Sequence, residues 1–202
     1  MGIRLGRWLR ERWFTSRTKD PLWEHFIYRA PADPRNNLTP ALQGAPAGRI
    51  YPVKTEVSDP HTMSRQLKEF GQWLGADLVG IAALQPAHVQ PSDQVELSYP
   101  FAIVCTMATD YDPQKATGLG GQLAVRNGAV VNHHLRNYIR ELGYRTSVGG
   151  VDPGAIAVAA GLGTVDQRGR LVAKTRGAYL HVADAILTDL PLVPDGPPTP
   201  GA

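Results

Sequence analysis

A stretch interrupted by glycines near the carboxyl end constrains the fold most. Residues 155–160 are small and helix-forming, Gly161 and Gly163 follow, and apolar runs come next at about 170–174 and 178–187. Because only glycine adopts a positive φ at little cost, the helix is expected to end at one of these glycines. The pattern therefore predicts a helix, a glycine loop and two strands. The loop either offers backbone N–H groups to a polar ligand or is an ordinary helix cap before a hairpin.

The remainder of residues 59–192 predicts alternating helices and short strands. Asp59 followed by Pro60 is typical of a helix start, and apolar residues continue at helical spacing to Gly75. Strands are expected at 77–83, 101–107 and 144–148, and a helix at 126–142 that ends before Gly143. A glycine-rich loop, with Gly118, Gly120 and Gly121, precedes this helix. Such alternation without a repeat indicates a layered domain in which helices pack against one sheet.

The positive charge of the chain is concentrated at its amino end. The net charge is +3, but residues 1–19 carry six basic residues and one glutamate, so the remainder is mildly acidic. Nucleic-acid binding by the folded domain is therefore not expected. Leu5, Trp8, Leu9 and Trp13 lie at helical spacing among the arginines. Residues 1–19 are predicted to form a basic amphipathic helix that binds an acidic protein or a membrane surface, or that packs on its own domain.

Proline separates this helix from the domain. Six prolines fall between residues 20 and 57, so we expect residues 20–58 to form an extended arm without regular structure that wraps the domain or a partner. Residues 193–202 are expected to be a flexible tail. No apolar run approaches the roughly 18 residues of a spanning helix, which favours a cytoplasmic protein, peripheral at most.

Few residues are candidates for metal chemistry. The single cysteine, Cys105, lies in an apolar run and excludes a cysteine-ligated cluster within this chain. His61, in Asp-Pro-His-Thr-Met-Ser, approaches a pattern by which some methyltransferases ligate cobalt, although a helix cap explains it better. His133 and His134 are adjacent on a predicted helix and point about 100° apart, so one face does not present both to a metal. No metal site is predicted.

Polar candidates cluster around the glycine loop. Arg168, Lys174, Arg176 and Tyr179 are placed to hold a phosphate, with solvated hairpin charges as the alternative. Tyr111, flanked by two aspartates at a strand end, is a candidate proton donor. It is more typical of an aromatic residue that covers the core at a turn.

Five blocks of sequence resemble one family in order. They are Gly-Ala-Asp-Leu-Val-Gly-Ile-Ala (75–82), Met-Ala-Thr-Asp-Tyr-Asp (107–112), Tyr-Ile-Arg-Glu-Leu-Gly-Tyr-Arg (138–145), Ala-Gly-Leu-Gly (160–163) with Arg168-Gly169, and Thr-Asp-Leu-Pro-Leu-Val-Pro-Asp (188–195). Together they resemble the cobalamin-binding domain of reductive dehalogenases and epoxyqueuosine reductases.

The resemblance implies a nitroreductase-like α+β domain over residues 59–192, with one central sheet flanked by helices. It also implies cobalamin bound with its lower base detached. Gly161, Leu162, Gly163, Arg168, Lys174 and Tyr179 are the implied cofactor-binding residues.

The sequence also departs from this family at positions of chemical importance. Family members continue into a region with two cysteine clusters, whereas this sequence has one cysteine. Residues 121–128 lack the catalytic tyrosine, and an Asn-Asp pair is absent near Gly149 and Gly150. Leu180, His181 and Val182 stand where an arginine is expected.

Two functions follow from this combination of match and departure. One is a stand-alone corrinoid-binding subunit that receives electrons from an iron–sulfur partner. The alternative is a non-catalytic homologue that serves in the assembly of a larger complex. A flavin-binding relative of nitroreductases is a third interpretation. The chain alone is not expected to catalyse dehalogenation.

Overall fold

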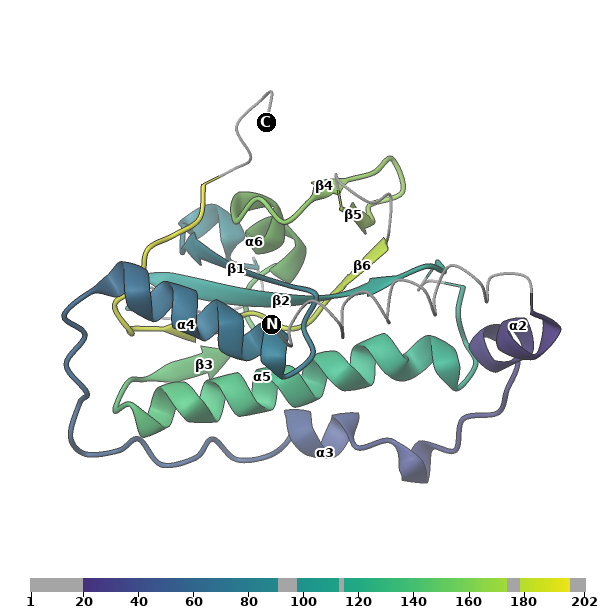
Figure 1. Cartoon of the computed structure of the whole chain (residues 1–202), viewed down its shortest axis with the longest axis horizontal. Helices are drawn as coiled ribbons and strands as arrows, with labels where there is room; N and C mark the ends of the chain where they lie inside the picture. The colour runs from purple at the N-terminus through teal and green to yellow at the C-terminus, as the bar shows by residue number, and fades with distance from the viewer. Residues whose placement is uncertain (1–19, 91–97, 113–114, 174–178, 197–202) are drawn as a thin grey trace, which may run out of the picture.

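The computed structural model describes residues 20–90, 98–112, 115–173 and 179–196, which form helices on both faces of one sheet (Figure 1). The expectation of an α+β domain with a central sheet flanked by helices is confirmed. The predicted helix at 1–19 and residues 197–202 of the predicted tail lie outside the described residues. None of the described helices combines the length and apolar character that crossing a lipid bilayer requires.

The described residues form five α-helices, three short 3-10 helices and seven strands. The helices are α2 (Pro21–Tyr28), α3 (Thr39–Gln43), α4 (Pro60–Trp73), α5 (Leu123–Glu141) and α6 (Pro153–Ala159), with η1 (Pro34–Asn36), η2 (Pro86–His88) and η3 (Gly120–Gln122). The strands are β1 (Leu78–Ala83), β2 (Phe101–Thr109), β3 (Thr146–Val148), β4 (Thr164–Val165), β5 (Leu171–Val172), β6 (Tyr179–Val182) and β7 (Ile186–Thr188).

Strand β2 is the centre of an antiparallel sheet. It pairs with β1 along one edge, and along the other edge it pairs first with β7 and then with β6. The sheet continues from β6 to β5 and β4, and from β7 to β3. The single strand predicted at 178–187 is therefore two strands, interrupted at 183–185. The Ala183 N–H still donates to the Cys105 carbonyl at 3.0 Å, so the interruption remains attached to β2.

Local signals explain where the main helices begin and end. The Asp59 carboxylate accepts hydrogen bonds from the backbone N–H groups of His61 and Thr62, which satisfies free donors of the first turn of α4. This geometry supports the helix-cap interpretation of the Asp59–His61 segment. Gly75 and Gly143, with φ of 118° and 86°, follow α4 and α5 as predicted.

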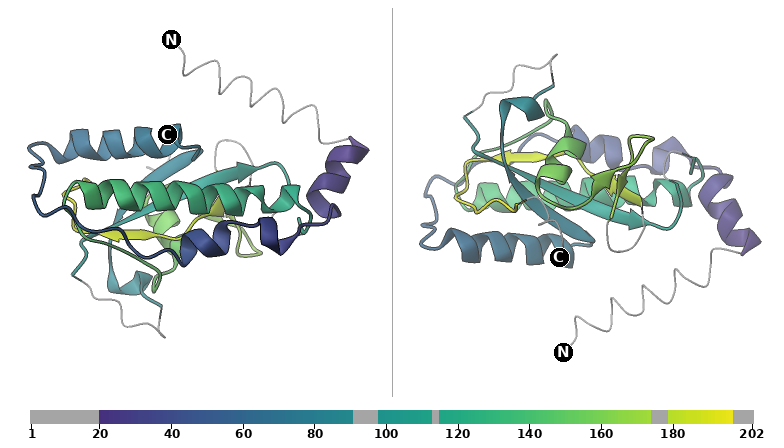
Figure 2. Two further views of the ribbon diagram at one scale, coloured as in Figure 1. Left: turned by 90° about the horizontal axis from the view of Figure 1, so that it is seen from below. Right: turned by 90° about the horizontal axis from the view of Figure 1, so that it is seen from above.

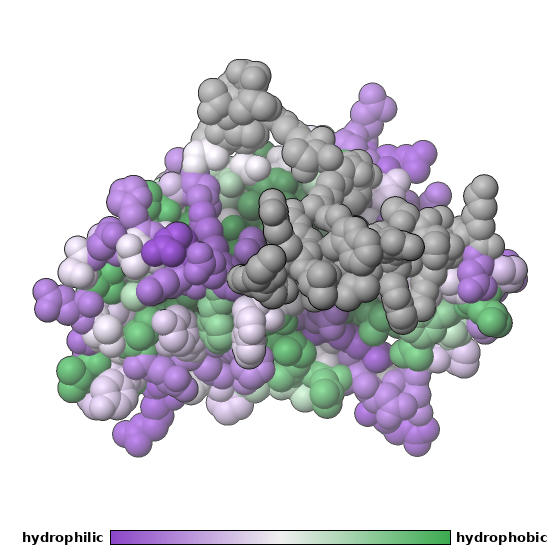
Figure 3. All heavy atoms as spheres, in the orientation of Figure 1, coloured by the Kyte–Doolittle hydropathy of each residue, from purple (hydrophilic) through white to green (hydrophobic). Residues whose placement is uncertain are grey.

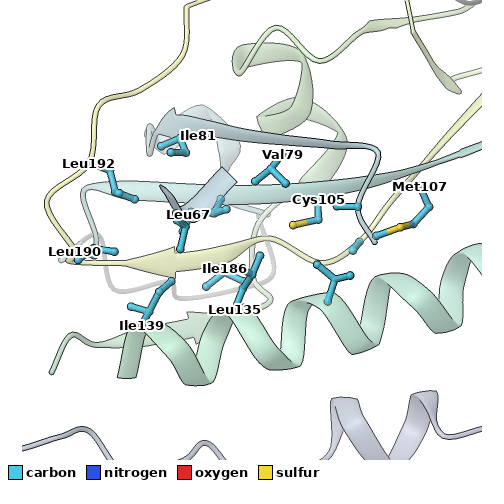
Figure 4. Packing of buried hydrophobic residues seen from close by; sticks show 14 of the residues in the cluster. Leu67, Val79, Ile81, Cys105, Met107, Leu135, Ile139, Ile186, Leu190 and Leu192 are labelled. Carbon is cyan, nitrogen blue, oxygen red and sulfur yellow. The ribbon is translucent and has the colours of Figure 1, made fainter. Parts of the chain in front are cut away.

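Each face of the sheet has its own apolar core, because side chains alternate along the strands. Ile103 and Cys105 of β2 face α4 and α5, where they pack with Leu67 and Leu135 (Figure 4). Ala102 and Val104 face α6 and pack with Ile156 on the other side. Hydrophilic residues gather on the outer surface over α4 (Figure 3).

The arm differs from the prediction because it contains helices. Pro21 and Pro40 lie in the first turns of α2 and α3, where the missing N–H of proline costs no helical hydrogen bond. The prediction treated these prolines only as helix breakers, and it was wrong for both segments. The arm runs past α5 to the start of α4, with α3 beside α5 (Figure 2).

The glycine-rich loop before α5 receives this arm. The Gly118 N–H donates to the Ile27 carbonyl at 2.9 Å. A Cβ on Gly118 would lie 2.6 Å from the Phe26 carbonyl oxygen, so only glycine permits this approach. The loop therefore forms a docking surface for α2.

Candidate functional site

The glycine loop after α6 uses its backbone donors internally. Gly161 has φ of 72°, and its N–H donates to the Val158 carbonyl at 2.9 Å. The Leu162 N–H donates to the Ala157 carbonyl at 3.0 Å, which closes the last turn of α6. The Leu162 side chain packs into the α6-side core. These two N–H groups are thus committed to the helix end.

Gly163 is required by the fold for a different reason. A Cβ at this position would lie 2.5 Å from the Val172 carbonyl oxygen, closer than real Cβ contacts. The close approach is to the backbone of β5 and not to an open space for a ligand. The glycine pair therefore has structural roles of its own, and its predicted role in binding a corrinoid stays a prediction.

Two of the four residues predicted to hold a phosphate lie in the part of the chain that the structure describes. Arg168 is exposed, and its backbone N–H donates to the Asp166 carboxylate at 2.8 Å in the β4–β5 turn. Tyr179 lies at the start of β6. Lys174 and Arg176 lie outside the described residues.

The sequence interpretation missed the arginine at the centre of this region. Arg170 is 13% exposed in its side chain and forms ion pairs with Asp112 at 2.7 Å and Asp166 at 2.6 Å. Its guanidinium carbon lies 4.5 Å from the centre of the Tyr179 ring. The hydrogen bond from Arg170 lowers the pKa of Asp166 to about 2. With both carboxylates bound to it, the guanidinium is fully engaged in joining β2 to the β4–β5 hairpin.

Tyr111 is turned towards the arm-docking loop. Its hydroxyl donates to the Gly120 carbonyl at 3.2 Å, and the Gly121 carbonyl is 3.4 Å away. Burial, with the charges of Asp110 and Tyr28, raises the pKa of Tyr111 to about 12. The hydroxyl thus has partners within the fold, as expected of an aromatic residue that covers the core at a turn.

A cavity of about 120 Å³ lies between α3, α5 and the β6–β7 interruption. We call it the α5 pocket. It is lined by Leu42 and Gln43 of α3, Val125, Ala129, Asn132, His133 and Arg136 of α5, Val148 of β3, and His181, Val182, Ala183 and Asp184. A second cavity lies along α4 near residues 193–195. Neither cavity includes the glycine loop.

The α5 pocket is the place where the three departures from the family pattern meet. Val125 comes from residues 121–128, Val148 precedes Gly149, and His181 stands where an arginine is expected. These segments are far apart in the sequence. The fold therefore brings residues from, or next to, these three segments to one pocket.

Polar atoms in the pocket are left without hydrogen-bond partners. These are Nε of Arg136, Oδ1 of Asn132 and Nδ1 of His133, all buried. Burial lowers the pKa of His181, against the opposing effect of Asp184. Burial, with the neighbouring charges of Arg136 and His134, also lowers the pKa of His133. The pocket thus favours neutral imidazoles beside a buried arginine.

A pattern in α5 could have revealed this site. A fully buried stripe of α5 consists of Val131, Leu135 and Ile139. Asn132 and Arg136, four residues apart, come directly after Val131 and Leu135. Polar residues four apart at the margin of a buried stripe point into the same space. Within the part of the chain that the structure describes, no group of three or more histidine, cysteine and acidic residues is arranged to hold a metal ion.

The fold is similar to that of a solved reductive dehalogenase. No family model matches the chain, and a search of curated proteins gives no match either. The catabolic reductive dehalogenase NpRdhA superimposes with a TM-score of 0.64 and 24% identity over 81% of this chain and 26% of that one. A reductive dehalogenase structure described as suggesting a mechanism for B12-dependent dehalogenation gives the same values. The predicted likeness in fold is confirmed.

This chain spans about a quarter of the length of the dehalogenase. Epoxyqueuosine reductase from Streptococcus thermophilus also matches, with a TM-score of 0.48 and 16% identity over 68% of this chain and 49% of that one.

Proposed function

We propose that this chain is a non-catalytic subunit built on the reductive dehalogenase fold, and that it acts through a partner protein. The observation that carries the proposal is the lining of the α5 pocket. Val125 and His181 lie in the segments where the resemblance implies a tyrosine and an arginine, and Val148 directly precedes Gly149, near which it implies an Asn-Asp pair. The chain thus keeps the fold but lacks the tyrosine, the Asn-Asp pair and the arginine that the resemblance implies.

The cysteine content of the chain supports the same proposal. Cluster ligands must be thiolates, and burial raises the pKa of Cys105, the one cysteine, to about 12. Its side chain is fully buried in the core between the sheet and α5. Electrons for any reductive chemistry would therefore come from a group outside residues 1–202.

The proton donor predicted from the sequence gives no support for catalysis. General acids work best when their pKa lies near the working pH. Burial raises the pKa of Tyr111 to about 12, and its hydroxyl already donates to the Gly120 carbonyl. This geometry suits a structural residue.

The arm leaves two large apolar side chains exposed. Ile27 of α2 is buried, whereas Leu22 on the same helix is 79% exposed and Leu38, just before α3, is 68% exposed. The arm thus docks on its own domain and still leaves large apolar side chains outside. These side chains, and the basic sequence of residues 1–19, support docking on an acidic site of a larger enzyme complex.

A turnover assay tests the proposal. The purified chain is mixed with cobalamin, a chemical reductant and a halogenated phenol, and halide release is compared with that from free cobalamin and reductant. We expect the two rates to be equal. Faster release in the presence of the protein would overturn the proposal, and removal of residues 1–19 is expected to abolish co-purification with the partner complex.

A second candidate is corrinoid binding with electrons supplied by a separate iron–sulfur protein. The fold shared with a B12-dependent dehalogenase favours it. The Gly161 and Leu162 N–H groups close the end of α6, so such binding would use other contacts than these two donors. Titration of the purified chain with cobalamin, followed by absorbance, distinguishes the candidates: saturable spectral change supports corrinoid binding, and its absence supports the assembly subunit.

A further inference from the structure

The α5 pocket contains a buried positive charge that has no counter-charge among the residues that the structure describes. Arg136 is 7% exposed, and none of the ion pairs among the described residues involves it. Its hydrogen bond within the described structure runs from Nη2 to the Ala45 carbonyl at 3.4 Å, near the limit for such a contact. A charge removed from water without a partner destabilises the fold strongly, so this guanidinium lacks an anion.

The remaining charged and titratable groups of the pocket do not supply that anion. Asp184 is exposed, and its carboxylate accepts a hydrogen bond from the Gln43 side chain at 3.5 Å. Its backbone carbonyl accepts from the buried Asn132 side chain. His133 and His181 have lowered pKa values and carry little charge at neutral pH. The carboxylate of Asp184 therefore stays in water at the rim, while the guanidinium lies inside.

Apolar side chains line much of the rest of the pocket. Val125 and Ala129 come from α5, Val148 and Val182 come from the sheet, and Leu42 comes from the arm. A ligand in this space would meet both a planar donor group and aliphatic carbon. Phosphate fits poorly, because its second negative charge would face Asp184 and its remaining oxygens would face the apolar wall.

We propose that the α5 pocket binds a small organic carboxylate, with the carboxylate paired to Arg136 and the carbon body against the aliphatic wall. The guanidinium fork matches the two oxygens of a carboxylate, and a single negative charge balances the single buried positive charge. His133 offers its unpartnered Nδ1 beside this pair. The arm, through Leu42, Gln43 and Ala45, closes the pocket from outside.

Thermal unfolding of the full chain with benzoate or acetate as the probe tests this site. Binding to the folded state alone raises the midpoint with ligand concentration. We expect a saturable rise with one or both carboxylates, no rise with benzamide, and at least a tenfold weaker response in Arg136→Met. Arg65→Met is the matched control, because Arg65 is an exposed arginine on α4, and it should respond as the wild type does.

A second variant keeps the test decisive if Arg136→Met folds poorly. Ala129→Leu places added carbon in the cavity and leaves the guanidinium in place, so it should fold and lose the response to the carboxylates. Absence of any response in the wild-type chain would overturn the proposal. So would an equal response of wild type, Arg136→Met and Ala129→Leu, or an equal response to benzamide.

Discussion

Two sets of polar groups differ in how fully they are hydrogen-bonded. One set is the carboxylates at the ends of strands, and the other is the polar groups of the α5 pocket. Asp189, after β7, accepts from the Arg145 backbone at 2.7 Å and from its side chain at 3.0 Å. Asp77, before β1, accepts from the Ala108 N–H at 2.7 Å. Arg136 in the pocket has one long hydrogen bond. Sites with complete bonding stabilise the fold, and sites with missing partners are candidates for binding.

The strand-end carboxylates also belong to the blocks that carry the family resemblance. Asp77 lies in the block 75–82, and Asp189 and Asp195 lie in the block 188–195. Asp195 accepts from the Ile81 N–H at 2.9 Å while pairing with Lys68. Their observed role is to hold strand ends and connecting segments together. The resemblance in these blocks is therefore explained by folding alone, which is why it predicts fold better than function.

Removing a strand-end carboxylate should have the largest effect on stability. We expect Asp189→Ala to lower the free energy of unfolding by about 3 kcal/mol, because Arg145 and its backbone N–H lose a charged acceptor in a partly buried site. Urea unfolding measures the change. Glu69→Ala, which removes an exposed carboxylate on α4, is the control and should change stability by less than about 0.5 kcal/mol. Equal effects of the two would contradict the comparison.

The glycine loop offers the next largest effect. Gly163→Ala should destabilise the chain by about 2 kcal/mol, because the new methyl group would meet the Val172 carbonyl oxygen 2.5 Å away and the backbone would have to shift. The control is Gly196→Ala, where no atom lies within 4 Å of the added carbon. If Gly163→Ala leaves the urea midpoint unchanged, the structural role given to this glycine is wrong.

Much of the fold was predictable because its signals are local. The Asp59–Pro60 cap, the glycines after α4 and α5, and the apolar run of β2 each depend on neighbours in the sequence. The arm helices were missed because proline has opposite meanings in the first turn and the interior of a helix. The strand break at 183–185 was missed because it depends on packing against α5.

The candidate site was less predictable because its contacts are distant. Arg136 contacts the Ala45 carbonyl, 91 residues earlier in the chain, and Arg170 joins Asp112, 58 residues earlier. The sequence drew attention to Arg168, whereas two positions later Arg170 forms the ion pairs. Which of two nearby arginines is buried depends on the tertiary fold, and hairpin spacing alone does not decide it.

Replacing the pocket arginine should have an effect of opposite sign. In buffer without a carboxylate ligand, Arg136→Met is expected to raise the free energy of unfolding by about 1 kcal/mol, since it removes a buried unpaired charge and keeps much of the apolar volume. Urea unfolding beside Asp189→Ala provides the direct contrast. A loss of stability comparable with that of Asp189→Ala would mean that Arg136 is bonded as fully as the strand-end groups.

The smallest expected effect is the pH dependence of the Asp166–Arg170 pair. The hydrogen bond from Arg170 lowers the pKa of Asp166 from 3.8 to about 2. Because the folded-state pKa is the lower one, this carboxylate stabilises the fold above about pH 4. That contribution is lost as the pH falls from about 4 towards 2, where the folded state also becomes protonated.

Comparison with Asp166→Asn isolates this carboxylate from all the others that titrate in the same range. The amide does not ionise, so the wild type should have the higher urea midpoint at pH 5, and the difference should shrink between pH 4 and pH 2. Asp33→Asn is a useful control, because Asp33 pairs with a strongly exposed arginine and little coupling to the fold is expected. The difference in urea midpoint between wild type and Asp166→Asn could instead stay constant from pH 5 to pH 2. That result would show that the ionised carboxylate of Asp166 does not stabilise the hairpin, and that the Arg170 contact acts through hydrogen bonding common to acid and amide.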